Sequence, residues 1–177
     1  MIDYLAEIKQ FHAEFVQPYT GKPKGCRDSE VRKIEDYFGL ELPLAYKQYL
    51  KFMGKDYNGV FIGSNWFVGN VIENTEWLPQ FLVEKQIEFN LPERFLVFFS
   101  HQENSAGWFD LPAANDDPPI WLITESNSSP RSVETFTGFL FRDMKTTALV
   151  FRDIYGIDGK PKNKTFLDPI FNLFKRR

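Results

Sequence analysis

Residues 28–54 read DSEVRKIEDYFGLELPLAYKQYLKFMG, and this stretch decides how the first third of the chain folds. Its apolar side chains recur every three or four positions, at Val31, Ile34, Tyr37, Phe38, Tyr46, Tyr49, Leu50 and Met53. Asp28 is a suitable N-cap and Gly39 a suitable terminator, so the spacing predicts an amphipathic helix between them. Pro43 suits the first turn of a second helix, which Gly54 ends. The stretch therefore predicts two short helices in close succession.

After Asn58-Gly59 the pattern changes from helical spacing to short β-prone runs. Residues 60–62 and 66–68 read as two brief strands between glycines. Three further runs, at 95–100, 107–111 and 120–124, are separated by polar or proline-containing turns. Connections this short cannot supply the crossover that parallel strands need, so these strands are expected to form an antiparallel meander.

Helical patterns are also found before the first predicted strand and between the strands at 66–68 and 95–100. Residues 2–17 show helical spacing, and Pro18 is expected to stop that helix before a loop at 18–27. Residues 73–89 fit either a helix broken at Pro79 or irregular structure, and we favour a short helix.

The C-terminal side of the chain is also expected to be helical. A closing helix is predicted over residues 136–150, capped by Ser132 or Thr135. Residues 154–164 read as a loop, and the apolar set after Asp168-Pro169 reads as a short helix that docks on the domain or on a partner. The fold class is thus α+β, with N-terminal helices, a central mostly antiparallel sheet and C-terminal helices in one domain over residues 1–177.

Composition limits the class of protein. With 177 residues, 43% of them apolar and 17% aromatic, the chain is long enough to bury the core of one domain. The lone Cys26 cannot form an intramolecular disulfide, which indicates a reducing compartment. The opening MIDYLAEIKQ is unlike a signal peptide, and no apolar run approaches the roughly 20 residues of a membrane span. We expect a cytoplasmic protein that contacts no membrane.

The order of motifs between residues 28 and 145 resembles that of the SUKH superfamily, which includes the yeast cell-wall-synthesis regulator and many bacterial immunity proteins. The first part of the likeness is the run Glu30-Val31-x-x-Ile34-Glu35-x-x-Phe38-Gly39-x-x-Leu42-Pro43-x-x-Tyr46-x-x-Tyr49-Leu50, with Asn58-Gly59 after it. The second part is Phe98, then residues 107–110, then 119–122, then Phe136-x-x-Phe139-Leu140, in the order of that family's hairpin, strand and closing helix.

The resemblance implies an α+β fold without an active site. It also implies a role like that of the bacterial members, which bind and neutralise a toxin domain, often a nuclease. The chain departs from the family pattern at Asn58-Gly59-Val60, where paired glycines are often found. Its N-terminal helix at 2–17 and its extension at 154–177 lie outside the likeness, so the identity of the partner does not transfer.

A search for catalytic or metal-binding residues favours a protein that is not an enzyme. The two histidines, His12 and His101, are expected on an exposed part of the first helix and at a strand end. No nucleophile elbow or glycine-rich phosphate loop is present. Asp116-Asp117 could hold a divalent cation, but beside Pro118-Pro119 they read better as an exposed loop. We expect no cofactor and no metal.

The charge distribution points to a partner. Residues 1–72 hold nine acids and nine bases, residues 73–125 ten acids and two bases, and residues 126–177 five acids and ten bases. An acidic middle segment attracts a basic protein and repels nucleic acid, provided that its carboxylates share a face. The predicted partner-binding residues lie in or beside the strands and turns: Glu103, Trp108, Asp110, Asp116, Asp117 and Glu125. Solvation of loops is the alternative role for these acids.

The hypothesis that combines these observations is an immunity protein that binds a basic toxin domain, with Trp108 as the aromatic anchor of the interface. A regulatory scaffold that binds a cellular protein is the alternative, with the C-terminal helix as a docking arm. A third class, an enzyme or a carbohydrate-binding module, would be built around the tryptophans.

Overall fold

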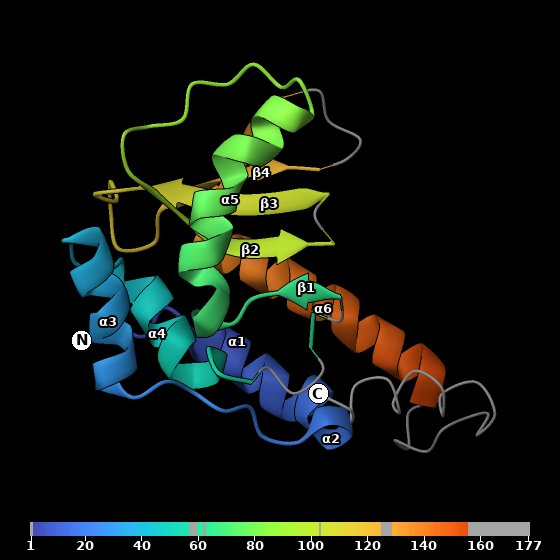
Figure 1. The fold of residues 1–177 in the computed structure, drawn as a ribbon. Coiled ribbons are helices and arrows are strands. Elements are labelled where there is room, and N and C mark those ends of the chain that lie inside the picture. The colour runs from blue at the N-terminus through green and yellow to red at the C-terminus, as the bar shows by residue number, and fades with distance from the viewer. Residues whose placement is uncertain (1, 57–59, 62, 103, 125–128, 156–177) are drawn as a thin grey trace.

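The computed structural model describes residues 2–56, 60–61, 63–102, 104–124 and 129–155, without the side chains of Val133 and Tyr155. The predicted C-terminal loop and helix lie outside the described residues, as do Glu103 and Glu125. Within the described part, helices and a sheet form the predicted α+β fold (Figure 1).

The N-terminal helical segment runs further than predicted. It consists of α1 (Ala6–Phe11), a π-helical turn η1 (His12–Val16) and α2 (Gln17–Thr20). The prediction that Pro18 stops the helix is wrong. The π-helical turn ends at Val16 and α2 begins at Gln17, so Pro18 lies in the first turn of α2. Backbone N–H groups in the first turn of a helix have no partner within the helix, so a proline is tolerated there.

The next two helices confirm the prediction from residues 28–54, except that Asp28 is the first helical residue and not the N-cap. They are α3 (Asp28–Phe38) and α4 (Leu44–Met53). Arg27 is the N-cap residue of α3, and its backbone N–H donates to the Glu30 carboxylate at 2.9 Å. Gly39 ends the helix with a φ of 64°, a left-handed conformation that favours glycine.

The described residues include one antiparallel sheet of five strands in the order β1-β2-β3-β4-β5. The strands are β1 (Ser64–Asn65), β2 (Phe95–His101), β3 (Ser105–Asp110), β4 (Pro119–Ile123) and β5 (Arg131–Thr135). The central meander of β2, β3 and β4 is confirmed.

Two features of the sheet differ from the prediction. Described residues of 60–62 and 66–68 form no strand, because Val60, Phe61 and Trp66 are buried as core side chains and only Ser64–Asn65 pairs with β2. The edge strand β5 was not predicted. Its sequence, RSVET, is polar and carries no apolar alternation that would mark it as a strand.

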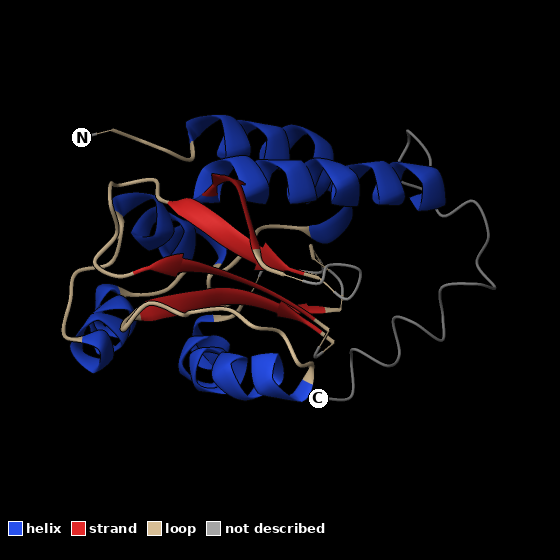
Figure 2. Cartoon of the chain, turned by 90° about the horizontal axis from the view of Figure 1, so that it is seen from above, coloured by secondary structure: helices blue, strands red, loops and turns tan. Residues whose placement is uncertain are grey.

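Helices cover both faces of this sheet (Figure 2). One face packs against α5 (Val71–Glu84), which follows a 3₁₀ turn, η2 (Val68–Asn70). The other face packs against α4 and α6 (Phe136–Tyr155), with the N-terminal helices beyond them. Successive strand residues point to opposite faces, so β3 places Trp108 under α5 and Phe109 against α4 and α6.

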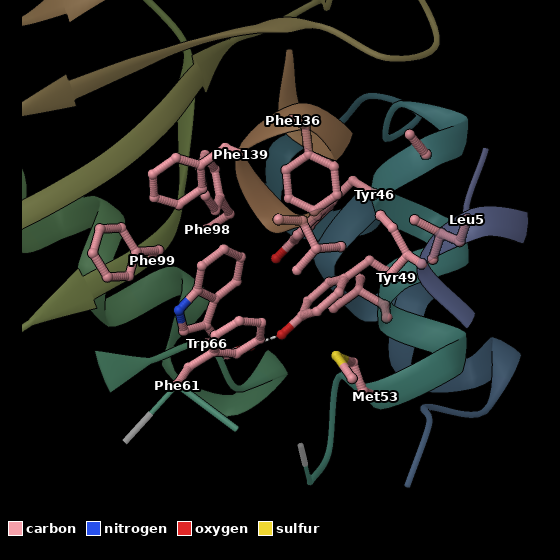
Figure 3. Packing of buried hydrophobic residues seen from close by; sticks show 14 of the residues in the cluster. Leu5, Tyr46, Tyr49, Met53, Phe61, Trp66, Phe98, Phe99, Phe136 and Phe139 are labelled. Carbon is pink, nitrogen blue, oxygen red and sulfur yellow. Dashed lines mark hydrogen bonds between the residues drawn. The ribbon is translucent and has the colours of Figure 1, made fainter. Parts of the chain in front are cut away.

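The larger core cluster is dominated by aromatic rings (Figure 3). The Trp66 ring contacts rings from three elements: Tyr49 of α4, Phe98 and Phe99 of β2, and Phe139 of α6. The Tyr49 hydroxyl also donates to the Trp66 carbonyl at 2.9 Å. This cluster fixes the helices against the sheet.

His12 is 1% exposed, so the prediction that it lies on an exposed part of the first helix is wrong. The η1 turn directs it inward, where its ring meets the edge of Phe52 at a centroid distance of 5.4 Å. Burial lowers the pKa of His12 because the charged imidazolium loses its hydration.

The buried His12 makes stability depend on pH. Below about pH 6.5 the unfolded chain takes up a proton at this imidazole that the folded chain does not, so we expect the free energy of unfolding to fall as the pH drops from 7 to 5. Urea titrations at several pH values measure this. The His12→Phe variant should show a smaller decrease than His101→Gln, which keeps the buried imidazole. Equal pH profiles in the two variants contradict the assignment.

Gly25 lies where the loop before α3 crosses α4, and the backbone N–H of Cys26 donates to the Leu50 carbonyl at 2.8 Å. A Cβ on Gly25 would overlap the backbone carbonyl of Lys51, whereas a Cβ on Gly69 meets no atom within 4 Å. We expect Gly25→Ala to lower the free energy of unfolding by about 1–3 kcal/mol. Gly69→Ala should change it by less than about 0.5 kcal/mol. Equal denaturation midpoints for the two variants count against this packing.

Candidate partner-binding surface

The described acids of the predicted site, Asp110, Asp116 and Asp117, lie at one end of the sheet. Asp110 ends β3, and Asp116 and Asp117 lie in the loop between β3 and β4. β2 and β4 end at the opposite end of the sheet, since β2 begins opposite Asp110 and ends opposite Ser105. Glu103 and Glu125 lie outside the described residues.

The prediction that Trp108 anchors a partner requires correction, because this side chain is 0% exposed. It packs with Leu78, Phe81 and Val97 beneath α5, and the Phe89 ring meets it edge-on at 5.8 Å. Because helices cover both faces of the sheet, a tryptophan on a central strand is buried whichever face its side chain points to. Trp108 has no surface for a partner to contact.

Asp117 caps a helix. Its carboxylate accepts hydrogen bonds from the backbone N–H of Thr137 at 3.0 Å and from the Thr137 hydroxyl at 2.6 Å, in the first turn of α6. The predicted cap Thr135 is confirmed, since its hydroxyl accepts from the Gly138 N–H at 3.3 Å. The negative charge of Asp117 also complements the positive end of the helix dipole. This acid therefore has a structural role in the fold.

The loop that carries these acids forms hydrogen bonds with the first turns of two helices, α4 and α6. The carbonyl of Asp116 accepts from the Ala45 N–H at 2.9 Å, at the beginning of α4, and its side chain is exposed. Of the described acids in the predicted site, Asp110 and Asp116 are thus the two with exposed side chains.

Among the described residues, Ser64, His101 and Asp143 bring a hydroxyl, an imidazole and a carboxyl group into one region. The Ser64 hydroxyl lies 2.8 Å from His101 Nδ1, across the pairing of β1 with β2. Burial raises the pKa of Asp143 on α6, while Arg142 and His101 oppose that rise. Ser64 is 9% exposed. We interpret the Ser64–His101 contact as a tie that holds the two-residue strand β1 to the sheet.

Metal-binding groups are dispersed in the described part of the chain, where no three His, Cys, Asp or Glu side chains come together in a way that could hold an ion. Cys26 is buried, and burial, with a contribution from Glu30, raises the pKa of its thiol to about 11. This thiol is a poor nucleophile and a poor ligand at neutral pH.

A different surface is both exposed and acidic: the outer side of α5, which we call the α5 face. It comprises Glu73, Glu76, Trp77, Gln80, Val83 and Glu84 of α5 together with Tyr37 of α3. At 3.6 residues per turn the six α5 side chains fall within an arc of about 120°. Opposite them, Leu78, Phe81 and Leu82 pack on the sheet. The α5 face therefore lies on the side of the helix that no described element covers (Figure 1).

Tyr37 joins α3 to the α5 face. Its hydroxyl donates to the Glu76 carboxylate at 2.7 Å, and this hydrogen bond raises the pKa of the Tyr37 phenol. The Tyr37 side chain is 49% exposed and Val83 is 78% exposed. The face thus combines carboxylates with apolar and aromatic side chains.

The acids of the α5 face differ in their partners from three acids near α3 and α4. Asp28, Glu30 and Glu35 form salt bridges with Lys51, Lys55 and Lys47 at 2.6, 2.8 and 3.2 Å. Among described residues, Glu73, Glu76 and Glu84 form no salt bridge. The charge of the α5 face is therefore not neutralised within the described structure.

Comparison of the sequence with models of protein families gives a match. The family model SUKH_6, described as SMI1-KNR4 cell-wall, matches residues 28–140. The chain belongs to the SUKH superfamily.

The SUKH match begins at the first residue of α3 and ends within α6, so it contains the α5 face and the whole described sheet. The comparison with curated proteins found no match. In the described part of this SUKH chain, no helix is both long enough and apolar enough to cross a membrane.

Sequence reasoning did not select the α5 face. The prediction for residues 73–89 leaves open a helix broken at Pro79 or irregular structure, so it does not place their acids on one side of a continuous helix. The structure shows one helix from Val71 to Glu84 with Pro79 exposed on it. The spacing of Glu73, Glu76, Gln80 and Glu84 at three and four residues was the signal that a continuous SUKH helix would carry them on one side.

Two neighbouring substitutions test the structural role of Asp117. Asp117→Ala removes the two hydrogen bonds to Thr137 in the first turn of α6 and keeps the Thr135 cap, and we expect it to lower the free energy of unfolding by about 1 kcal/mol. Asp116→Ala, which keeps the backbone carbonyl that Ala45 uses, should change it by less than about 0.5 kcal/mol. Thermal and urea unfolding measure both. Equal stabilities would show that the Asp117 hydrogen bonds contribute nothing to the fold.

Proposed function

We propose that this SUKH protein is a protein-binding domain without enzymatic activity, and that it neutralises a toxin domain by direct binding. The observation that carries the proposal is the family match over residues 28–140. It supports a role in immunity because the bacterial members of the superfamily that the sequence resembles bind and neutralise toxin domains. The proposal places the protein in the cytoplasm, where such a toxin acts.

The charge pattern supports a basic partner. The three carboxylates of the α5 face form no salt bridge with described residues, and the segment 73–125 holds ten acids against two bases. Such a surface speeds the association of a basic protein and repels nucleic acid. These properties suit an inhibitor of a basic nuclease domain, since the acidic inhibitor then competes with the negatively charged nucleic acid for the same basic surface of the nuclease.

A regulatory scaffold is the second candidate, and the description of the matched family as SMI1-KNR4 cell-wall favours it. In that case the protein binds a cellular partner, with the segment after α6 as a docking arm. Removal of residues 156–177 separates the two candidates. A folded variant that still neutralises the toxin favours immunity, whereas a folded variant that loses a cellular partner favours the scaffold.

The test of neutralisation is co-expression with a candidate toxin domain chosen from the products of the genes that neighbour this one. We expect growth to be restored and a stoichiometric complex to be recovered. The association rate should fall at least about tenfold as salt is raised from about 50 to 500 mM, because screening weakens long-range attraction. Growth that stays arrested with both proteins folded contradicts neutralisation. A rate that does not depend on salt contradicts the electrostatic part.

A further inference from the structure

We propose that the α5 face is the surface that receives the partner, and that it takes a basic protein segment presenting an apolar side chain between Lys or Arg residues. This inference rests on the proposed protein-binding function and names the surface and the chemistry that this function uses.

The first argument is the continuity of the surface. From Glu73 to Glu84 the outer side of α5 extends about 16 Å, at 1.5 Å per residue. The hydrogen bond of Tyr37 to Glu76 fixes the end of α3 beside the first half of α5. Two helices that are far apart in the sequence thus present one surface, held by a defined contact and supported from beneath by the sheet.

The second argument is charge. Glu73, Glu76 and Glu84 face one side of the helix without a salt bridge to any described base. The base next to them, Lys85, places its Nζ 5.9 Å from the centroid of the Phe81 ring. A partner with Lys or Arg side chains at matching positions would supply the missing opposite charges.

The third argument is the set of apolar contacts available between the carboxylates. Val83 is the most exposed of the large apolar side chains of the described chain, at 78%. The half-buried Trp77 ring is supported by Phe81 at a centroid distance of 4.6 Å. Tyrosine and tryptophan are enriched in interfaces because they supply rigid apolar area, and both rings attract cations over their faces. An apolar residue flanked by basic ones matches this mixture.

Charge also decides against other occupants. In a symmetric contact with a second copy of the chain, each α5 face would lie against another set of unpaired carboxylates, and like charges across an interface are unfavourable. A nucleic acid is repelled for the same reason. A basic protein segment is the occupant that gains from both the carboxylates and Val83.

The experiment uses the full chain and a synthetic 18-residue amphipathic helix of Lys and Leu as the probe, with a Glu and Leu peptide of the same pattern as its control. Backbone amide shifts in NMR spectra map the site, and the shifts of the Tyr37 ring report its end. We expect the Lys peptide to shift the outer residues of α5 and Tyr37, and the Glu peptide to shift neither.

Two double substitutions with the same change in net charge make the test specific. Glu73→Lys/Glu84→Lys reverses the charge of the α5 face, and Glu7→Lys/Glu14→Lys reverses two exposed acids of α1 and η1 that form no salt bridge with described residues. The first pair changes one acid near each end of α5, so its two effects on the helix dipole oppose one another. We expect the α5 pair to weaken the Lys peptide at least about tenfold and the α1 pair less than about twofold.

A matched truncation tests the apolar contact. Val83→Ala should weaken the Lys peptide several-fold, whereas Leu149→Ala, at a 51% exposed position on α6, should leave its affinity unchanged. Equal weakening by the two double substitutions, or shifts centred outside the α5 face, overturns the proposal, because the peptide would then respond to net charge alone.

Co-expression with the toxin domain distinguishes failure of this inference from failure of the proposed function. If the wild-type chain and both double variants restore growth equally, neutralisation stands and the α5 face is not its surface. If the wild-type chain restores no growth, neutralisation fails, and the peptide titration still decides whether the α5 face receives basic segments. Protection by the α1 pair and loss of protection by the α5 pair supports both.

Discussion

The indole of Trp66 is the contact on which the other parts of the fold depend. It stacks on Phe61 at 4.5 Å and meets rings of α4, β2 and α6 within 5.7 Å (Figure 3). The backbone carbonyl of Trp66 also accepts a hydrogen bond from the buried Tyr49 hydroxyl. Because protein interiors pack as densely as organic crystals, a smaller residue here would leave a cavity that touches every layer on this side of the sheet.

Coverage of the sheet on both faces decides where a partner can bind. β2 and β3 have buried side chains facing both ways, with Val97 and Trp108 toward α5 and Phe98 and Phe109 toward α4 and α6. The middle of the sheet therefore offers a partner no open face. Recognition is left to the strand ends, the sheet edges and the outer sides of the helices, and the α5 face is an acidic surface of the last kind.

The sequence predicted those elements whose local signals agree with their surroundings. α3 and α4 have apolar residues at helical spacing, and glycines follow both. The prediction of strands at 60–62 and 66–68 was wrong. The apolar side chains of Val60, Phe61 and Trp66 pack in the core, and their backbone forms no strand. β5 was missed because it is a polar edge strand. Trp108 and Asp117 were misassigned because β-sheet coverage and a cap from a residue 20 positions earlier are tertiary facts that no local window contains.

The two sides of α5 are under different physical constraints. Leu78, Phe81 and Leu82 are fixed by the sheet, and a change of volume there disturbs the core. Glu73, Val83 and Glu84 contact solvent, so substitutions at these positions have little effect on the stability of the fold. One scaffold can therefore keep its inner face and change the outer one to suit a new partner. This separation explains why the family match establishes the fold of the chain, whereas the chemistry of its partner has to be read from the exposed residues of this chain alone.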